Sequence, residues 1–164
     1  MNPVQFGNRW VGHNEPVVVV AEIGTNHEGD VESCLECVRQ SARAGASAIK
    51  LQTSDPSEHY PPEHPSFSLF SSARLSQDAT RKAFDLARSL GMEAFSTTGF
   101  NDLEWLLELE PAAMKVSSGL LTHTTLVHRL AQTGRTLILS TGMSEGPIID
   151  DAVRVARDGG CANP

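Results

Sequence analysis

The pattern of hydrophobic positions opens on four consecutive valines, which begin the stretch VVVVAEIGTNHEGD. A run of β-branched residues without polar interruption predicts a buried strand over residues 17–24. Glu22, Asn26 and His27 fall at the carboxyl end of this strand, and Asp30 then caps a helix. Parallel α/β proteins place their chemistry at such strand ends, so we expect the chain to be organised around this stretch.

The same cycle of a short apolar strand followed by an amphipathic helix is repeated along the chain. After Asp30, apolar residues recur at spacings of three and four, which indicates a helix that Gly45 ends. Four further cycles follow, and this alternation predicts βαβ units and a parallel sheet. The predicted strands occupy residues 17–24, 46–53, 92–98, 112–118 and 136–142. The predicted helices occupy residues 30–44, 76–90, 101–109, 124–132 and 145–158.

Two segments fall outside this cycle. Residues 1–16 are polar and contain glycines and prolines, and we interpret them as an N-terminal flap, with a short hairpin as one form of it. Residues 54–72 contain four prolines and predict a loop, of a length that is usually functional or disordered inside a compact domain.

The number of cycles predicts the fold class. Five strands, each followed by a helix, suit part of a (β/α)8 barrel of the TIM type, which typically needs about 250 residues. The chain has 164 residues and ends where a sixth strand is expected. We therefore predict one domain over residues 1–164, made of the flap and of about five of eight βα units over residues 17–164.

Composition and charge exclude several classes of function. The net charge is −7 without a Lys/Arg-rich run, which argues against binding to nucleic acid. No apolar run approaches the roughly 18 residues of a membrane span, and the N-terminus lacks the regions of a signal peptide. Three cysteines give no disulfide framework, so we expect a cytoplasmic protein. Cys34 and Cys37 form a C-x-x-C inside a predicted helix, where packing is favoured over redox or metal chemistry.

The carboxyl ends of parallel strands lie at one edge of the sheet, so their polar residues converge. A lysine at the end of a buried strand is unfavourable unless it meets an anion. Lys50 and Lys115, with the hydroxyls of Thr97 and Ser118, therefore predict a site for a phosphate and a carboxylate. The alternative is that each lysine reaches the rim and pairs with Glu22 or a loop acid. The predicted strand ends carry Glu22, Lys50, Gln52, Ser96, Thr97, Lys115, Ser117, Ser118, Ser140 and Thr141.

Other ionisable residues admit two interpretations each. Glu22 suits a general acid/base and equally a carboxylate that balances the lysines. His27 is expected to be a hydrogen-bonded structural residue rather than a metal ligand. The proline-rich loop also contains residues that suit substrate contact or metal binding, although a solvated loop is favoured for them. These loop residues are Glu58, His59, Glu63 and His64.

Five motifs together resemble the sialic acid synthase family, and the resemblance covers residues 17–158. It implies a (β/α)8 barrel that condenses phosphoenolpyruvate with an N-acylated hexosamine such as N-acetylmannosamine. C3 of phosphoenolpyruvate attacks the open-chain aldehyde, water adds at C2, and phosphate leaves by C–O cleavage. In that family a divalent metal, usually Mn²⁺ or Mg²⁺, polarises the aldehyde. The motifs are AEIGTNHEG (21–29), KLQT (50–53), FSTT (95–98), MKVSSG (114–119) and ILSTGMS (138–144).

The resemblance also implies roles for individual residues. Phosphoenolpyruvate would be held by four residues, Glu22 would lie beside the reacting centre, Gln52 would contact the sugar, and Asn26 would belong to the substrate-binding set. The family's metal-binding histidines belong to later strands, so no metal ligand is expected in this chain. The four residues for phosphoenolpyruvate are Lys50, Thr97, Lys115 and Ser118.

The chain departs from the family pattern at three places. Leu120 stands where an acid usually follows SSG, STTGF replaces STPF, and the segment 54–75 is shorter than usual. The first hypothesis is therefore the N-terminal part of a synthase, inactive alone. The second is a non-catalytic anion-binding module that associates, for example as a homodimer, because an open barrel exposes two strand edges. The third is a related synthase acting on a phosphorylated aldose, against which the chain shows no extra basic cluster.

Overall fold

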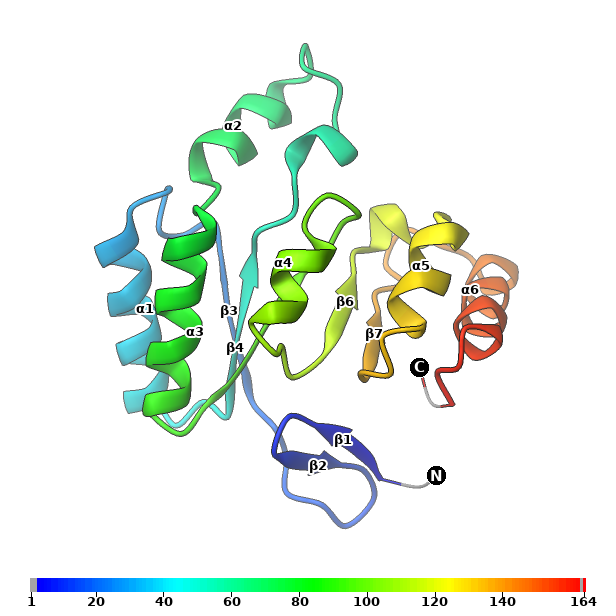
Figure 1. Cartoon of the computed structure of the whole chain (residues 1–164), viewed down its shortest axis with the longest axis horizontal. Helices are drawn as coiled ribbons and strands as arrows, with labels where there is room; N and C mark the ends of the chain where they lie inside the picture. Colours follow the sequence, from blue (N-terminus) through cyan, green and yellow to red (C-terminus); the bar gives the residue numbers. More distant parts are fainter. Residues whose placement is uncertain (1–2, 163) are drawn as a thin grey trace.

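The computed structural model describes residues 3–162 and 164, and its centre is a five-stranded parallel sheet (Figure 1). The strands follow one another in chain order, and each is followed by a helix, which confirms the predicted part of a (β/α)8 barrel. The strands are β3 (Val20–Gly24), β4 (Ala48–Gln52), β5 (Glu93–Thr97), β6 (Met114–Val116) and β7 (Leu137–Leu139). The helices that follow them are α1 (Val31–Arg43), α3 (Gln77–Ser89), α4 (Leu103–Glu108), α5 (Thr124–Ala131) and α6 (Gly146–Asp158).

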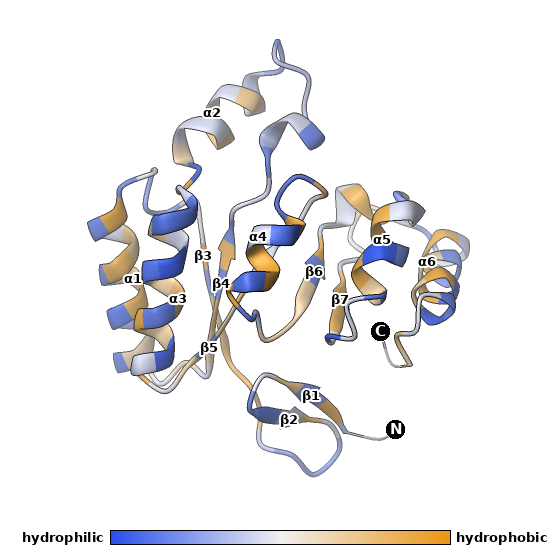
Figure 2. Ribbon diagram, in the orientation of Figure 1, coloured by the Kyte–Doolittle hydropathy of each residue, from blue (hydrophilic) through white to orange (hydrophobic). Residues whose placement is uncertain are grey.

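The helices begin at the predicted caps and bury one face. The Asp30 carboxylate accepts a hydrogen bond from Ser33 N at 2.7 Å, and the Ser76 hydroxyl accepts one from Ala79 N at 3.2 Å. In Figure 2, helices α1, α3 and α6 alternate hydrophilic and hydrophobic residues, as expected for helices with one solvated face. Helices α1 and α3 pack together over the sheet through Val38, Phe84 and Ile49, all fully buried.

The prediction of a buried strand from the first valine is wrong. The strand begins at Val20, while Val17 and Val19 are 84% and 55% exposed. The physical reason is that β3 lies at the edge of the sheet, so the valines before it have β4 on one side only. Val18 and Val20 do pack on the inner apolar cluster around Phe95.

The N-terminal flap is a hairpin, as one interpretation of its sequence allowed. Strands β1 (Val4–Phe6) and β2 (Arg9–Val11) are antiparallel and lie at the end of the sheet opposite to the strand carboxyl ends (Figure 1). The Phe6 ring meets Phe95 edge-on at 5.4 Å between centroids. Gly7 has a φ of +59° and donates its N–H to Ala112 O at 3.2 Å, so the hairpin closes this end of the sheet.

The prediction that residues 54–72 are a loop is also wrong, because they contain the 3₁₀ helix η1 (Pro56–Glu58) and most of helix α2 (Pro65–Ala73). Pro56 and Pro65 stand in the first turn of each helix, where the missing N–H has no intrahelical partner to lose. Asp55 and His64 cap these helices through their side chains. We call residues 55–74 the arm, which projects from the carboxyl edge of the sheet (Figure 1).

Across the described residues, none of the helices combines the length and the hydropathy needed to span a bilayer.

Candidate active site

A cleft of about 300 Å³ lies at the carboxyl edge of the sheet, between the strand ends and the arm. The structure brings five of the predicted site residues to this cleft, namely Lys50, Gln52, Thr97, Lys115 and Ser118. Glu22 adjoins it through Lys50, whereas Asn26 is exposed and not among the lining residues. The lining residues are Lys50, Gln52, Ser54, Pro56, His59, Tyr60, Phe70, Thr97, Lys115, Ser117, Ser118, Gly119, Ser140 and Met143.

Lys50 is held by the pairing of β3 with β4. Glu22 lies opposite Lys50 in the parallel register, and Lys50 Nζ is 2.6 Å from Glu22 Oε2. The Lys50 side chain is 8% exposed, while that of Glu22 is 61% exposed. The interpretation in which the lysine pairs with Glu22 is therefore realised for Lys50, and the pair opens to solvent on the carboxylate side.

Lys115 has a different environment. Its Nζ donates to Ser140 Oγ at 2.5 Å and to Val116 O at 3.3 Å. Within the part of the chain that the structure describes, it forms no ion pair with a carboxylate. Burial, and then the positive charge of Lys50, lower the pKa of Lys115, and Glu22 partly opposes this shift. An anion in the cleft would offset the repulsion between the two ammonium groups.

Hydroxyl groups complete the floor of the cleft. Thr97 is 5% exposed and follows directly on Ser96 in β5. Ser96 is fully buried, and its hydroxyl proton is not free for a ligand, because its Oγ donates to Leu51 O at 2.9 Å. Among the described residues, Ser117 Oγ is buried and has no hydrogen-bond partner, so it is available to a ligand or a water molecule in the cleft. Ser117 and Ser140 were expected at this edge, but sequence reasoning gave them no role in binding.

The arm supplies an aromatic wall to the cleft. The Tyr60 ring stacks on Phe70, with centroids 5.5 Å apart, and on His64 at 5.1 Å. His59 Nε2 lies 3.2 Å from Ser54 Oγ. Burial lowers the pKa of His59, against the nearby acids Glu58, Asp55 and Asp102. The solvated-loop interpretation is thus wrong for His59, and sequence reasoning missed Tyr60 and Phe70, which no motif marks.

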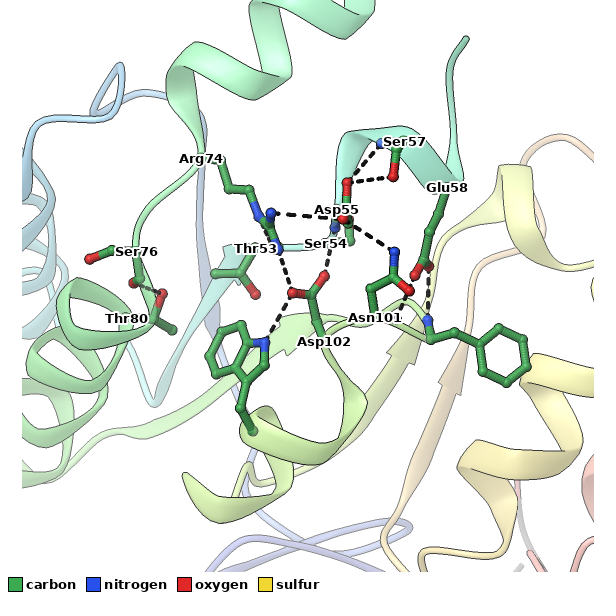
Figure 3. A network of polar contacts seen from close by, with 12 residues as sticks. Thr53, Ser54, Asp55, Ser57, Glu58, Arg74, Ser76, Thr80, Asn101 and Asp102 are labelled. Carbon is green, nitrogen blue, oxygen red and sulfur yellow. Dashed lines mark hydrogen bonds and ion pairs between the residues drawn. The ribbon is translucent and has the colours of Figure 1, made fainter. Parts of the chain in front are cut away.

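A polar network fastens the arm to the loop after β5 (Figure 3). Asp102 is fully buried and accepts hydrogen bonds from Arg74, from Asp55 N and from the Trp105 indole. The Glu58 carboxylate accepts the N–H groups of two residues that precede Asp102. Sequence reasoning also misses these side chains, since an ion pair between distant segments leaves no local pattern.

His27 and Cys34 have structural roles. His27 is 2% exposed, and its Nδ1 accepts a hydrogen bond from Gly29 N at 3.1 Å. Burial lowers the pKa of His27, while a hydrogen bond with the Gly24 backbone and the Asp30 charge oppose this shift. Cys34 lies in the core, where burial and then the neighbouring Cys37 raise its pKa to about 11.

Two departures from the family pattern have physical explanations. Leu120 is 8% exposed and packs in the apolar cluster between β6 and α5, so an apolar residue suits its environment. Gly99 makes room for Glu58, because a Cβ on Gly99 would lie 1.8 Å from Glu58 Oε2.

The chemistry of the side chains does not fit a resident divalent metal. In residues 3–162 and 164, His, Cys, Asp and Glu side chains form no group of three or more that suits a metal ion. The lysines that dominate the cleft also repel a cation. We therefore derive no step through a metal held by these residues.

Five parallel strands, each followed by a helix, define part of a (β/α)8-barrel protein. The NeuB family model matches residues 37–163, so the chain belongs to the NeuB family. This confirms the resemblance to the sialic acid synthases.

Similar proteins agree with this assignment. An uncharacterized protein of Methanocaldococcus jannaschii is 34% identical over 162 residues, which cover 98% of this chain and 48% of that protein. The N,N'-diacetyllegionaminic acid synthase of Legionella pneumophila is 29% identical, over 82% of this chain and 42% of the relative. The N-acetylneuraminic acid (sialic acid) synthetase structure from Leptospira borgpetersenii superposes with a TM-score of 0.91 and 26% identity, over 96% of this chain and 56% of that chain. The chain spans about half the length of the curated relatives it matches.

Proposed function

We propose that the chain carries the phosphoenolpyruvate site of a nonulosonic acid synthase, an enzyme that condenses phosphoenolpyruvate with an N-acylated hexosamine such as N-acetylmannosamine. The observation that carries the proposal is the convergence of Lys50 and Lys115 on one cleft. The names of the relatives support the reaction class, since they include legionaminic, N-acetylneuraminate-9-phosphate and pseudaminic acid synthases.

The two lysines bind different groups of the substrate, and the hydroxyls support them. Phosphoenolpyruvate carries a phosphate and a carboxylate, and two ammonium groups on neighbouring parts of the floor match them. Thr97 and Ser118 add hydroxyl donors to the oxygen atoms that the lysines attract. Gln52, at the end of β4, is the proposed contact for the acceptor sugar.

The condensation makes a C–C bond and a C–O bond, and it breaks the C2–O bond to phosphate. C3 of phosphoenolpyruvate bonds to the aldehyde carbon, whose oxygen takes a proton, and the oxygen of a water molecule bonds to C2. The water gives up one proton as it adds to C2. The resulting C2 hydroxyl gives its proton to the departing phosphate as the C2–O bond to phosphate breaks and the C2 carbonyl forms. Glu22, which pairs with Lys50 at the edge of the cleft, is the proposed acceptor of the first proton. Mn²⁺ or Mg²⁺ stays a prediction from the family resemblance and enters none of these residue roles.

A ligand panel tests the proposal. In isothermal titration of the purified chain, phosphoenolpyruvate should bind at least about tenfold more tightly than pyruvate or inorganic phosphate, because it engages both lysines. Equal affinities for all three ligands would contradict a site built for a phosphate and a carboxylate together.

A second candidate is an anion-binding module that associates with itself. An apolar hollow at the hairpin end of the sheet is lined by Phe6, Val18 and Leu137, and Val17 and Val19 are exposed near it. A dimer in size-exclusion chromatography would support this candidate, and a monomer at high concentration would weaken it. The homodimer and the cytoplasmic location stay predictions.

A further inference from the structure

The arm is attached to the barrel by polar contacts rather than by an apolar face. Across the arm, all of which the structure describes, Pro56 and Ala73 are the two buried residues. The turn before α1 approaches the end of α2 so closely that a Cβ on Gly29 would lie 2.4 Å from Ser72 O. Little apolar surface therefore fixes the position of the arm over the cleft, and its polar contacts carry that task.

Asp102 is the centre of these contacts (Figure 3). Its Oδ1 accepts hydrogen bonds from Arg74 Nη2 at 2.5 Å and from Trp105 Nε1 at 3.0 Å. Its Oδ2 accepts the N–H of Asp55 at 2.6 Å. Both ends of the arm, at residues 55 and 74, thus meet on one buried carboxylate.

The same network reaches the strand that carries Lys50. Arg74 Nε donates to Thr53 O at 3.2 Å, and Thr53 N donates to Ser96 Oγ at 3.2 Å. Thr53 directly follows β4, and Ser96 directly precedes Thr97 in β5. These hydrogen bonds therefore fix the position of the arm relative to the strand ends that form the floor of the cleft.

Glu58 fixes the part of the arm nearest the cleft. Its Oε2 accepts the N–H of Phe100 at 2.8 Å and its Oε1 accepts that of Asn101 at 2.5 Å. Glu58 stands immediately before His59 and Tyr60, which line the cleft. A displacement of Glu58 would move these two rings with it.

We propose that Arg74, Asp102 and Glu58 are positioning residues, which hold the aromatic wall at a set distance from the lysines so that it receives the N-acylated hexosamine. The wall consists of His59, Tyr60 and Phe70, and aromatic faces suit the C–H face and the acyl group of such a sugar. This inference rests on the proposed function, because the lysine floor is assigned to phosphoenolpyruvate. The wall then decides acceptor affinity, and the floor decides donor affinity.

The experiment uses the single tyrosine of the chain as a reporter. Biosynthetic 3-fluorotyrosine gives one ¹⁹F resonance, from Tyr60. The binding of phosphoenolpyruvate, and of N-acetylmannosamine at saturating phosphoenolpyruvate, is measured in the wild type, Arg74→Met and Glu58→Gln. Arg39→Met is the matched control, since Arg39 forms an exposed ion pair with Glu36 on α1.

Arg74→Met and Glu58→Gln should shift the ¹⁹F resonance of Tyr60 and weaken N-acetylmannosamine binding by about tenfold or more, because small misplacements of a binding wall are costly. Phosphoenolpyruvate affinity should stay within about twofold, and Arg39→Met should change neither affinity. Arg74→Lys keeps the charge beside Asp102 but not the fork of donors, so it should recover part of the sugar affinity.

Three outcomes would overturn the inference. The first is that the variants lose affinity for phosphoenolpyruvate and for N-acetylmannosamine to the same extent. The second is that Arg74→Met binds N-acetylmannosamine as tightly as the wild type. The third is that the wild type binds phosphoenolpyruvate but not N-acetylmannosamine. If Arg74→Met does not fold by circular dichroism, Glu58→Gln decides. If the wild type binds no phosphoenolpyruvate, the proposed function fails. The Tyr60 resonance then still decides the positioning, which a shift in the variants supports and an unchanged line contradicts.

Discussion

The floor and the wall of the cleft are built in opposite ways. The floor is the end of a hydrogen-bonded sheet, and Leu51, between Lys50 and Gln52, is fully buried beneath it. The wall is a projecting arm whose rings stack mainly on one another and whose fixed points are polar. The comparison teaches that packing and strand register position the floor, while a few long-range hydrogen bonds position the wall.

The largest expected effect is a difference between the floor and the arm in how much a truncated side chain lowers the free energy of unfolding. Leu51→Ala removes a fully buried side chain and should lower the free energy of unfolding by about 2–5 kcal/mol. Phe70→Ala removes a half-buried ring of the arm and should lower it by only about 1 kcal/mol. Urea unfolding followed by circular dichroism measures both changes. Equal losses would mean that the arm is as much a part of the folding unit as the floor.

The next effect is the acid sensitivity of the turn that follows β3. Because burial lowers the pKa of His27, the unfolded chain binds a proton at a higher pH than the folded chain does. Stability should therefore fall as the pH drops from 6.5 toward the lowered pKa. His27→Asn retains an acceptor for Gly29 N, and in urea unfolding at pH 7.5 and pH 5 it should reduce this dependence.

The same substitution at exposed His13 is the control. The assignment to His27 would be refuted if the free energy of unfolding of His27→Asn depended on pH as that of the wild type does, while His13→Asn altered this dependence.

A smaller effect concerns the floor alone. Burial and Lys50 lower the pKa of Lys115, and an anion binds only to the protonated amine. Phosphoenolpyruvate affinity should therefore begin to fall at a lower pH than an ordinary lysine pKa of about 10.5 would give. Lys115→Arg, which stays charged, should remove the decline in titrations between pH 7 and pH 10. A decline that persists in this variant would point to another group.

The smallest effect lies far from the cleft and tests the packing of α1. With a pKa of about 11, Cys34 is roughly one-thousandth thiolate at pH 8, and it is also buried. Cys37 is half-buried and should react first with a disulfide reagent. Cys37→Ala should remove the fast phase of thiol labelling, and Cys34→Ala should leave it intact. The reverse order would mean that the helix opens.

The sequence predicts the floor better than the wall for a physical reason. Hydrophobic periodicity locates β4 and β6, and the parallel arrangement then brings Lys50 and Lys115 to one edge without further information. The prediction of a buried strand fails for the first valines because composition does not reveal that β3 lies at the edge of this sheet. The prediction of a loop fails for the arm because its prolines begin helices here, whereas proline is also a common turn residue.

The contacts that fix the arm were beyond sequence reasoning for another reason. Asp102 and Arg74 stand 28 positions apart, and each alone resembles a solvated surface residue. Only the folded chain shows that Asp102 is fully buried and that its charge is paired. Likewise, the departure at Gly99 acquires a meaning only when Glu58 is seen beside it.

The most direct test of the central claim is titration of phosphoenolpyruvate into the wild type, Lys50→Met, Lys115→Met and Lys82→Met. Lys82 is an exposed lysine on α3 that pairs with Asp78, so its variant controls for the loss of one positive charge. Losing one charged hydrogen-bond donor in the cleft should weaken binding roughly tenfold to a hundredfold, while Lys82→Met should match the wild type. Equal affinity in all four proteins would contradict a phosphoenolpyruvate site built on the two strand-end lysines.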